Sequence, residues 1–414
     1  MKLNRYWGAV CAVVAVAIIA AACGGSPSAK TGATKTLKVM SINPAPGFGL
    51  DWTLGQRGFF QRIDASGGID GHKVTFSTCS DGTFIAESQN LSYTCAQQAV
   101  ASGVFAVVGS LSNYDNVIYP VLLAANIPDI GSFPSTPIDY TSKESMPFLS
   151  PQIVLNAGLA IQLKQQAHCN NIAFLDQAGT PITRSSDDAF AAGGKWAGVK
   201  VSPAQDISAT TTDFAPTVAI LDGFGVDCLG FGLTQGDLPG LLTAIQDSGH
   251  PMKVTFVAAN VASSTLKAVG SNANGLLADL AGQYDAQVSN FNPPKATPGE
   301  KQLLKDFARF PASLNTSAID YPGWQAADAF YLGVKQVDKN NLPLTSKNLG
   351  EVMNNMLIHT GVFLDANFST NGPIPGYPRV HDTDVNWITV KNLQYVPYDY
   401  TLHPVGPALS HFKG

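Results

Sequence analysis

Residues 104–130 read VFAVVGSLSNYDNVIYPVLLAANIPDI, and this stretch decides the fold class. Val104–Val108 is continuously apolar, which is typical of a strand buried on both faces of a sheet. A loop of small residues follows, then helical spacing over Asn113–Ala125 and a second buried strand at Ile127–Ile130. A strand, a helix and another strand in this order indicate a parallel sheet covered by helices.

The same alternation extends along the chain in both directions. Upstream, strands are predicted at Leu37–Ile42 and His72–Thr78, with helices at Trp52–Ile63 and Phe84–Ala101. A second series follows a proline-marked break at Pro147–Pro151, and its strands are predicted at Ile172–Leu175, Lys200–Val201, Cys228–Phe231 and Val254–Val257. We therefore predict an α/β fold with two doubly wound parallel-sheet lobes.

The N-terminus has the features of an export signal. A short basic region contains Lys2 and Arg5, and an apolar run from Ala9 to Ala22 follows it. The run is too short for a membrane-spanning helix. Small residues before Cys23 resemble a bacterial lipobox, which implies removal of 1–22, lipidation of Cys23 and anchoring to the cell membrane. Residues 23–35 are predicted to be a flexible tether. The alternatives are an uncleaved anchor helix and an ordinary secretory signal.

Composition fits an exported globular protein. The chain has 414 residues, 13% of them charged, and a net charge of −5. This length accommodates two domains with their own cores. The sequence contains no block of basic residues, so we do not expect a nucleic-acid partner. It also lacks a Gly-rich phosphate loop, the zinc-protease motif H-E-x-x-H and the serine-hydrolase motif G-x-S-x-G, so we expect no cofactor, no metal and no enzymatic activity.

Four cysteines remain once Cys11 in the signal and Cys23 are set aside. An even number in an oxidising compartment predicts two disulfides, and the sequence alone allows three pairings. Cys79 follows a predicted strand and Cys95 lies on the next helix, so this pair is favoured. Cys169 and Cys228 precede strands that we expect to be neighbours. A buried free thiol is the alternative for each.

Two runs carry a resemblance to a known family. They are RIDASGGIDGHKVTFSTCSD (62–81) and VFAVVGSLSNYDNVIYPVLLAANIPDIGSFPSTP (104–137). Together with weaker sequence similarities downstream, they resemble lipoprotein forms of the periplasmic solute-binding proteins of the leucine/isoleucine/valine-binding type. The resemblance implies a type I periplasmic binding protein whose lobes are joined by a three-crossover hinge. Lobe 1 would comprise 36–149 with 280–360 and lobe 2 150–279 with 361–400, followed by a tail, 401–414.

Ligands of open α/β sheets lie beyond the carboxyl ends of the strands. The loop after the third predicted strand contains Ser110, Ser112 and Asn113, and a helix begins there. Hydroxyls and free backbone N–H groups at a helix N-terminus suit a carboxylate or another oxyanion. Capping of that helix by Ser112 or Asn113 is the alternative.

The resemblance implies further ligand-binding positions. Pro134 and Ser135 fall on a family segment that offers a backbone carbonyl and a hydroxyl, and Phe48 falls on an aromatic that covers the ligand. Thr180 stands where amino-acid binders have a tyrosine, and Asn260 stands where they have an acidic residue for the ligand's ammonium group. A neutral amide cannot replace that charge.

We therefore expect a ligand other than a free α-amino acid, such as a small amphipathic or carboxylate-bearing solute. In an alternative register, Asp176 or Asp237 supplies the carboxylate. Phe231 and Tyr321 are further aromatic candidates.

The resemblance implies a monomeric, extracytoplasmic substrate-binding protein that serves an ABC permease of the branched-chain amino acid importer family. A ligand-sensing module for a separate signalling partner is the second reading, because the fold also serves receptors. An exported hydrolase is the third.

Overall fold

A computed structural model describes residues 36–44, 52–83, 86–180, 182–281, 298–310, 320–359, 361–362 and 366–412. The chain divides into two units, 1–34 and 35–414, and every described residue belongs to the second. The predicted signal peptide and tether, with Cys23, lie outside the described residues, and so does Phe48. None of the helices in the described ranges is long and apolar enough to cross a bilayer.

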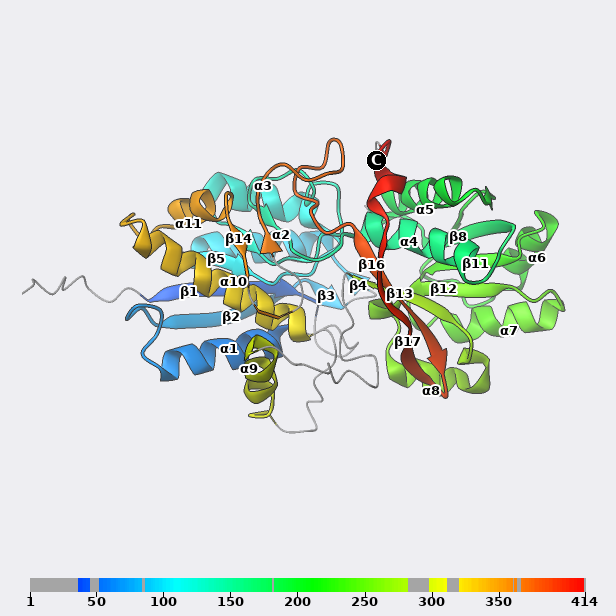
Figure 1. Ribbon diagram of the computed structural model, residues 1–414, viewed down its shortest axis with the longest axis horizontal. Helices are drawn as coiled ribbons and strands as arrows, with labels where there is room; N and C mark the ends of the chain where they lie inside the picture. The colour runs from blue at the N-terminus through cyan, green and yellow to red at the C-terminus, as the bar shows by residue number, and fades with distance from the viewer. Residues whose placement is uncertain are drawn as a thin grey trace, which may run out of the picture. The chain divides into compact units, whose positions relative to one another are not determined.

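The first sheet has five strands, and every pair in it is parallel. In order of pairing they are β2 (Val74–Ser80), β1 (Leu37–Asn43), β5 (Ala106–Val108), β6 (Asp129–Ile130) and β7 (Ser145–Met146). Its helices are α1 (Thr53–Ala65), α2 (Gln89–Ala101), α3 (Asp115–Ala125), α9 (Pro298–Phe307), α10 (Asp320–Lys339) and α11 (Ser346–Met353). Helices from the last third of the chain thus share a layer with α1 (Figure 1).

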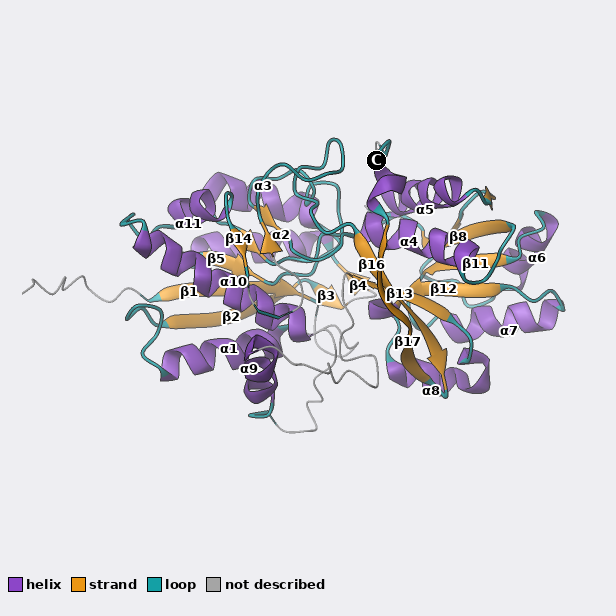
Figure 2. Cartoon of the chain, in the orientation of Figure 1, coloured by secondary structure: helices purple, strands orange, loops and turns teal. Residues whose placement is uncertain are grey.

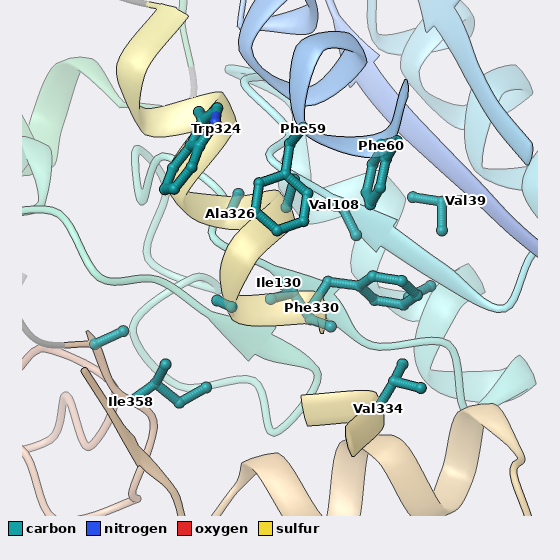
Figure 3. Packing of buried hydrophobic residues seen from close by; sticks show 14 of the residues in the cluster. Val39, Phe59, Phe60, Val108, Ile130, Trp324, Ala326, Phe330, Val334 and Ile358 are labelled. Atoms are coloured by element: carbon teal, nitrogen blue, oxygen red, sulfur yellow. The ribbon is translucent and has the colours of Figure 1, made fainter. Parts of the chain in front are cut away.

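Alternate residues of β1 face the two sides of this sheet, as the period of a strand requires. Val39 packs in a core with residues of α1, α10 and α11, whereas Met40 packs with residues of α2 and α3. Figure 3 shows the first of these cores, in which aromatic rings of α1 and α10 meet over the sheet. Helices therefore cover both faces, which explains why the central strands are continuously apolar.

A buried ion pair attaches α9 to this core. The Nε atom of Arg62 lies 2.8 Å from Oδ2 of Asp306, and the indole N–H of Trp324 donates to the same oxygen at 2.9 Å. The Arg62 guanidinium also lies 4.6 Å from the centre of the Phe59 ring. Three helices of the first lobe are thereby joined at one carboxylate.

The second sheet has eight strands. In order of pairing they are β10 (Gln205–Ile207), β8 (Asn171–Gln177), β11 (Cys228–Gly232), β12 (Lys253–Val257), β13 (Leu277–Ala281), β16 (Asp384–Lys391) and β17 (Gln394–Pro404), while β9 (Lys200–Val201) pairs with the start of β8. The pairs of β16 are antiparallel and the others are parallel.

Helices cover both faces of the second sheet as well (Figure 2). One core contains residues of α4 (Gln152–Gln165) and α5 (Thr183–Ala197). The other contains residues of α6 (Ala215–Gly223), α7 (Leu238–Ser248) and α8 (Ser263–Val269). Two short hairpins, β3 (Gly82–Thr83) with β4 (Ala86–Glu87) and β14 (Leu357–Ile358) with β15 (Ala366–Asn367), lie outside the main sheets.

The C-terminal segment differs from the predicted arrangement. Residues 401–404, expected in a tail, form the end of β17, and a 3₁₀ turn at Gly406–Leu409 packs against α5. Val405, Leu409 and Phe412 are buried in the second lobe's core. Ala366 and Phe368 still belong to the first lobe's core, so the chain returns to the second lobe later than residue 361. Apolar contacts hold the end of the chain in place. The prolines of this stretch gave the sequence the pattern of an unstructured tail.

Both predicted disulfides are present in the structure. Cys79 on β2 is bonded to Cys95 on α2, and Cys169 is bonded to Cys228 on β11. Cys228 pairs in register with Ile172 of the neighbouring β8. The second bridge therefore joins the starts of two adjacent strands in the second lobe.

Candidate functional site

A cavity that is partly open to solvent is lined by residues from both lobes. Trp52, Leu111 and Phe133 belong to the first lobe, and Phe174, Gly232 and Val257 belong to strands of the second sheet. The remaining described lining residues are Asn113, Leu149, Gln152, Leu155, Asn156, Asp176, Gln177, Thr180, Ile182, Ser186, Leu233, Thr234, Ala259, Asn260, Leu280, Ala281 and Pro322. Gly232 and Val257 end their strands, so the cavity lies where parallel sheets bind ligands.

Apolar groups form most of the wall. The Trp52 and Phe133 rings meet edge to face with centroids 6.4 Å apart. On the other side, Phe174 of β8 stacks on Phe190 of α5 at 4.9 Å. Such a wall gains free energy when the apolar body of a ligand leaves water.

The polar groups of the wall come mainly from the second lobe. Gln152 donates through Nε2 to Oδ1 of Asn156 at 2.9 Å, and the Asn156 side chain is 1% exposed. The Nδ2 atom of Asn156 has no hydrogen-bond partner among the described residues. Thr234 donates through Oγ1 to Oδ2 of Asp237 at 2.7 Å. The wall therefore holds one buried amide donor that a ligand could satisfy.

Asp176 is the single ionisable side chain among the described lining residues. It is 4% exposed, its Oδ1 accepts the Gln177 backbone N–H at 2.8 Å, and its Oδ2 has no partner among the described residues. Burial raises the pKa of Asp176 to about 8, and the acidic Asp187 and Asp206 contribute in the same direction. Burial also raises the pKa of Asp187 to about 7. Burial and the neighbouring carboxyl groups thus favour the neutral form of both acids.

Three of the predicted ligand-binding residues line the cavity. Asn113 follows β5, Thr180 follows β8, and Asn260 ends a 3₁₀ turn, Ala258–Asn260, directly after β12. Thr180 Oγ1 lies 2.8 Å from Oγ1 of Thr183. The structure thus brings together residues that are 147 positions apart in the sequence (113 to 260).

The predicted serines lie behind the wall. Ser110 accepts the Ile42 N–H at 3.2 Å, and Ser112 accepts the Tyr114 N–H at 3.1 Å, next to the start of α3. The Ser135 hydroxyl donates to the carbonyl of Ser112 at 2.6 Å. All three serines are 1% exposed and none lines the cavity. The Ser135 hydroxyl joins two loops of the first lobe, Ser110 attaches its loop to β1, and Ser112 stabilises its own turn.

The other predicted positions lie in the cores or behind the wall. Phe231 is fully buried in the second lobe, and Tyr321 packs edge to face on Phe307 at 5.3 Å in the first. Pro134 is buried, and its carbonyl accepts the N–H of Gln152, whose side chain lines the cavity. Phe48 lies outside the described residues.

Trp52, Phe133 and Phe174 line the cavity although they were not predicted to bind a ligand, and Asp176 was predicted only as an alternative. Asp176 sits near the carboxyl end of β8, where the strand-end rule would have found it. The other alternative, Asp237, accepts hydrogen bonds from Thr234 and is not among the lining residues. Phe133 also lies in a strand-end loop, directly after β6, but the hydroxyls of that loop were favoured over its aromatic ring, whereas Trp52 lies farther from the end of β1.

In the part of the chain that the structure describes, one group has the spacing of metal ligands, namely Cys169, Asp227 and Cys228. Both sulfur atoms belong to the second disulfide. A thiolate is the form that binds a metal, so this group is not a usable ligand set.

Comparison with known proteins places this fold. A family model described as periplasmic binding protein matches residues 43–374. A leucine binding protein, LivK, from Thermotoga maritima is 13% identical with a TM-score of 0.69, covering 89% of this chain and 99% of its own. A solute binding protein of an ABC transporter from R. palustris, in complex with 4-hydroxybenzoate, is 17% identical with a TM-score of 0.72 and coverages of 92% and 100%.

A branched chain amino acid ABC transporter structure from Thermus thermophilus with bound valine is 12% identical with a TM-score of 0.74 and coverages of 91% and 99%. No curated protein matches the sequence. The family match spans most of the chain, and the solved structures share its two-lobed architecture. The chain belongs to the periplasmic binding protein family and is a solute-binding protein with the type I fold of the leucine-binding proteins.

Proposed function

We propose that the protein is a lipid-anchored, extracytoplasmic substrate-binding protein of an ABC importer, and that it captures a small amphipathic solute. The observation that carries this proposal is the cavity, which is mostly apolar and is lined by the strand ends of one lobe and loops of the other. A solute bound there contacts both lobes and is removed from water when they close on it.

The lining suits a ligand with an apolar body and one polar end. The aromatic residues Trp52, Phe133 and Phe174 offer flat apolar surfaces, and Asn113, Asn260 and Asp176 offer polar atoms. Asn260 carries no charge, so it does not neutralise an ammonium group. Two of the similar structures hold small molecules of this general kind, 4-hydroxybenzoate in one and valine in the other.

The membrane anchor and the ABC importer are supported by the N-terminal sequence and by the similar structures. Small residues before Cys23 support removal of the signal and lipidation of that thiol. The printed descriptions of similar structures name ABC transporters, which supports an ABC permease as the membrane partner. We propose that the protein acts as a monomer and performs no chemistry on its ligand.

A screen of unfolding temperature tests binding directly. The secreted form carrying Cys23→Ser is heated with amino acids, amines, aliphatic and aromatic carboxylates, amides, alcohols and polyols. A ligand at a hundred times its Kd adds about 2.7 kcal/mol to stability, which raises the midpoint by several degrees. A rise with one class of small amphipathic solute is expected, and no rise with any compound would overturn the proposal.

The anchor has its own test. Cells that express the wild-type chain should hold it in the membrane fraction, and cells that express Cys23→Ala should not hold a lipidated form there. Metabolic labelling with palmitate should mark the wild type alone. Equal labelling of both proteins would contradict lipidation at Cys23.

A further inference from the structure

We infer that Asp176 binds an ammonium group, and that the solute is therefore an organic amine with an apolar body. This inference rests on the proposed function, because it names the polar end of the solute that the same cavity would capture. It differs from the carboxylate-bearing solute that the sequence led us to expect.

One carboxyl oxygen of Asp176 is buried without a hydrogen-bond partner in the described part of the chain. Oδ1 accepts the Gln177 N–H, whereas Oδ2 is buried and has no hydrogen-bond partner within 3.5 Å among the described residues. The nearby Ser186 hydroxyl, which also lines the cavity, lowers the pKa of Asp176 against the larger effect of burial. A buried carboxyl oxygen without a donor is costly, and a ligand that supplies an N–H removes that cost. Asp176 is 96% buried, and it lines the cavity together with the apolar residues that would hold the body of the amine.

Gly232 keeps the neighbouring space open. It pairs in register with Asp176 across β11 and β8, and it also lines the cavity. A Cβ atom at this position would lie 3.0 Å from Oδ1 of Asp176 and 2.7 Å from Cζ of Phe174. Its φ angle is not in the left-handed region, so backbone conformation does not require glycine there. Glycine at this position leaves space beside the Asp176 carboxyl group and the Phe174 ring, which any side chain would fill.

The surrounding charge selects a cation. Among the elements packed against β8, β10 carries Asp206, paired in register with Asp176, and α5 carries Asp187 and the exposed pair Arg184–Asp188. The cations Lys195, in the last turn of α5, and Lys200 of β9, which pairs with Asn171, lie toward the opposite end of β8. The neighbouring β11 has no ionisable group other than the bridged Cys228, and α4 has Lys164 near Cys169, at the opposite end of β8. No Lys or Arg is among the described lining residues. A carboxylate would meet like charge here, and an ammonium group would meet opposite charge.

Matched probes separate the end groups. Calorimetry at pH 8 compares 3-methylbutylamine and 2-phenylethylamine with their alcohols and with 4-methylpentanoate and 3-phenylpropanoate. Both amines should bind at least 30-fold more tightly than the acids of the same body. Tighter binding of the acids or alcohols would overturn the inference. Leucine and phenylalanine, measured alongside, show whether a carboxylate is tolerated beside the amine.

The pH dependence is a second readout. Because the pKa of Asp176 is raised to about 8, binding of an ammonium group must release its proton at lower pH. The Kd of each amine should therefore fall about tenfold per unit as the pH rises from 6 to 8, and then level off. A Kd that is constant over this range would overturn the inference.

Two variants connect the effect to this position. Asp176→Asn should weaken amine binding at least 30-fold and remove the pH dependence. Gly232→Ala, which fills the space beside the carboxyl group, should weaken it as well. Asp279→Asn is the matched control, because Asp279 is a fully buried acid of the same sheet that does not line the cavity. It should change the Kd less than twofold.

The two proposals fail in different ways. Undiminished amine binding by Asp176→Asn would overturn the role of Asp176 and leave the solute-binding function standing. If no amine binds but another class in the larger panel does, the inference fails alone. If no compound of either panel binds, the proposed function fails, and the inference fails with it.

Discussion

The hydroxyl of Ser150 lies 2.9 Å from Oδ2 of Asp382, across 232 positions of sequence. Ser150 stands in the segment between β7 and α4, where the chain first passes from one sheet to the other, and Asp382 stands just before β16, on a later passage. Ser150 also lies within 2.7 Å of the carbonyl oxygen of Asp384. These contacts join two of the segments that connect the lobes, so they set the position from which a hinge would move.

Removal of the Ser150 hydroxyl should destabilise the protein. Ser150→Ala removes the hydroxyl donor to Oδ2 of Asp382, while Oδ1 still accepts the Asp384 N–H at 3.3 Å. We expect a loss of about 1–3 kcal/mol in the free energy of unfolding. The loss should be larger at pH 8 than at pH 5, because burial raises the pKa of Asp382 to about 7 and the charged form needs the donor more. Urea unfolding at the two pH values measures both effects.

Thr94→Ala provides the control for that variant. Thr94 also donates a side-chain hydrogen bond, to the carbonyl of Asn90, but on an exposed helix surface. Its removal should change stability by no more than about 0.5 kcal/mol. Equal losses for the two variants would contradict the importance of the contact between the connecting segments.

Stability should fall as the pH rises from about 5 to 8. Burial, with the charge of Asp139 as the next cause, raises the pKa of Asp129 to about 8. Burial also raises the pKa of Asp176 to about 8 and that of Asp382 to about 7. Between the unfolded and folded pKa values the folded state holds protons that the unfolded chain has released. Rising pH therefore favours unfolding.

Asp129→Asn tests one of these groups. The amide keeps an oxygen that can accept the Tyr119 hydroxyl, which lies 3.3 Å from Oδ2, and it cannot ionise. The slope of unfolding free energy against pH should flatten by up to about 1.4 kcal/mol per pH unit between pH 5 and 8. Thermal or urea unfolding across this range measures the slope, and an unchanged slope would contradict a protonated Asp129.

Each disulfide should contribute substantially to stability. The Cys169–Cys228 bridge spans 59 positions and the Cys79–Cys95 bridge spans 16. The entropy of loop closure predicts losses of about 4 and about 3 kcal/mol when the paired cysteines are replaced by alanine. Denaturant unfolding of the two double variants checks the order. A smaller loss for the longer loop would show that the folded state, rather than the unfolded chain, dominates the effect.

Two glycines of the second lobe should respond in opposite directions to replacement by alanine. A Cβ at Gly193 in α5 would lie 2.3 Å from the carbonyl oxygen of Ala157 in α4, so Gly193→Ala forces the two helices apart. We expect a loss of at least about 1–3 kcal/mol. Gly223, at the end of α6, has no atom within 4 Å of its ideal Cβ, and Gly223→Ala should stabilise by about 0.4–1 kcal/mol. Thermal midpoints of the two variants test the sign, and a stabilised Gly193→Ala would contradict the helix packing.

The sequence predicted the parallel cores well because buried parallel strands are continuously apolar. Val104–Val108 and Cys228–Phe231 were found for that reason, and they correspond to β5 and β11. The strands β13 and β17 were not found. The LADLA sequence of β13 does not distinguish a strand from a helix, and β17 contains Pro397 and Pro404, which disfavour a strand assignment.

The sequence predicted cavity-lining residues correctly only where their position after a strand end places them at the site. Asn113, Thr180 and Asn260 follow strand ends, and all three line the cavity. Phe133 also follows a strand end, that of β6, and Trp52 precedes α1, but the sequence carries no pattern that separates an aromatic residue of a cavity wall from one of a core. The distinction depends on which lobe faces each residue, and that is a property of the whole fold.

Blocking the cavity tests the central claim most directly. Calorimetry measures binding of the compound that raises the unfolding temperature most, first to the wild type, then to Ala259→Trp, which places an indole in the cavity wall, and to the control Ala308→Trp on an exposed site outside it. We predict one molecule bound per chain for the wild type and the control, and at least a hundredfold weaker binding to a folded Ala259→Trp. Equal affinity for all three proteins would show that the solute binds elsewhere and would contradict the account.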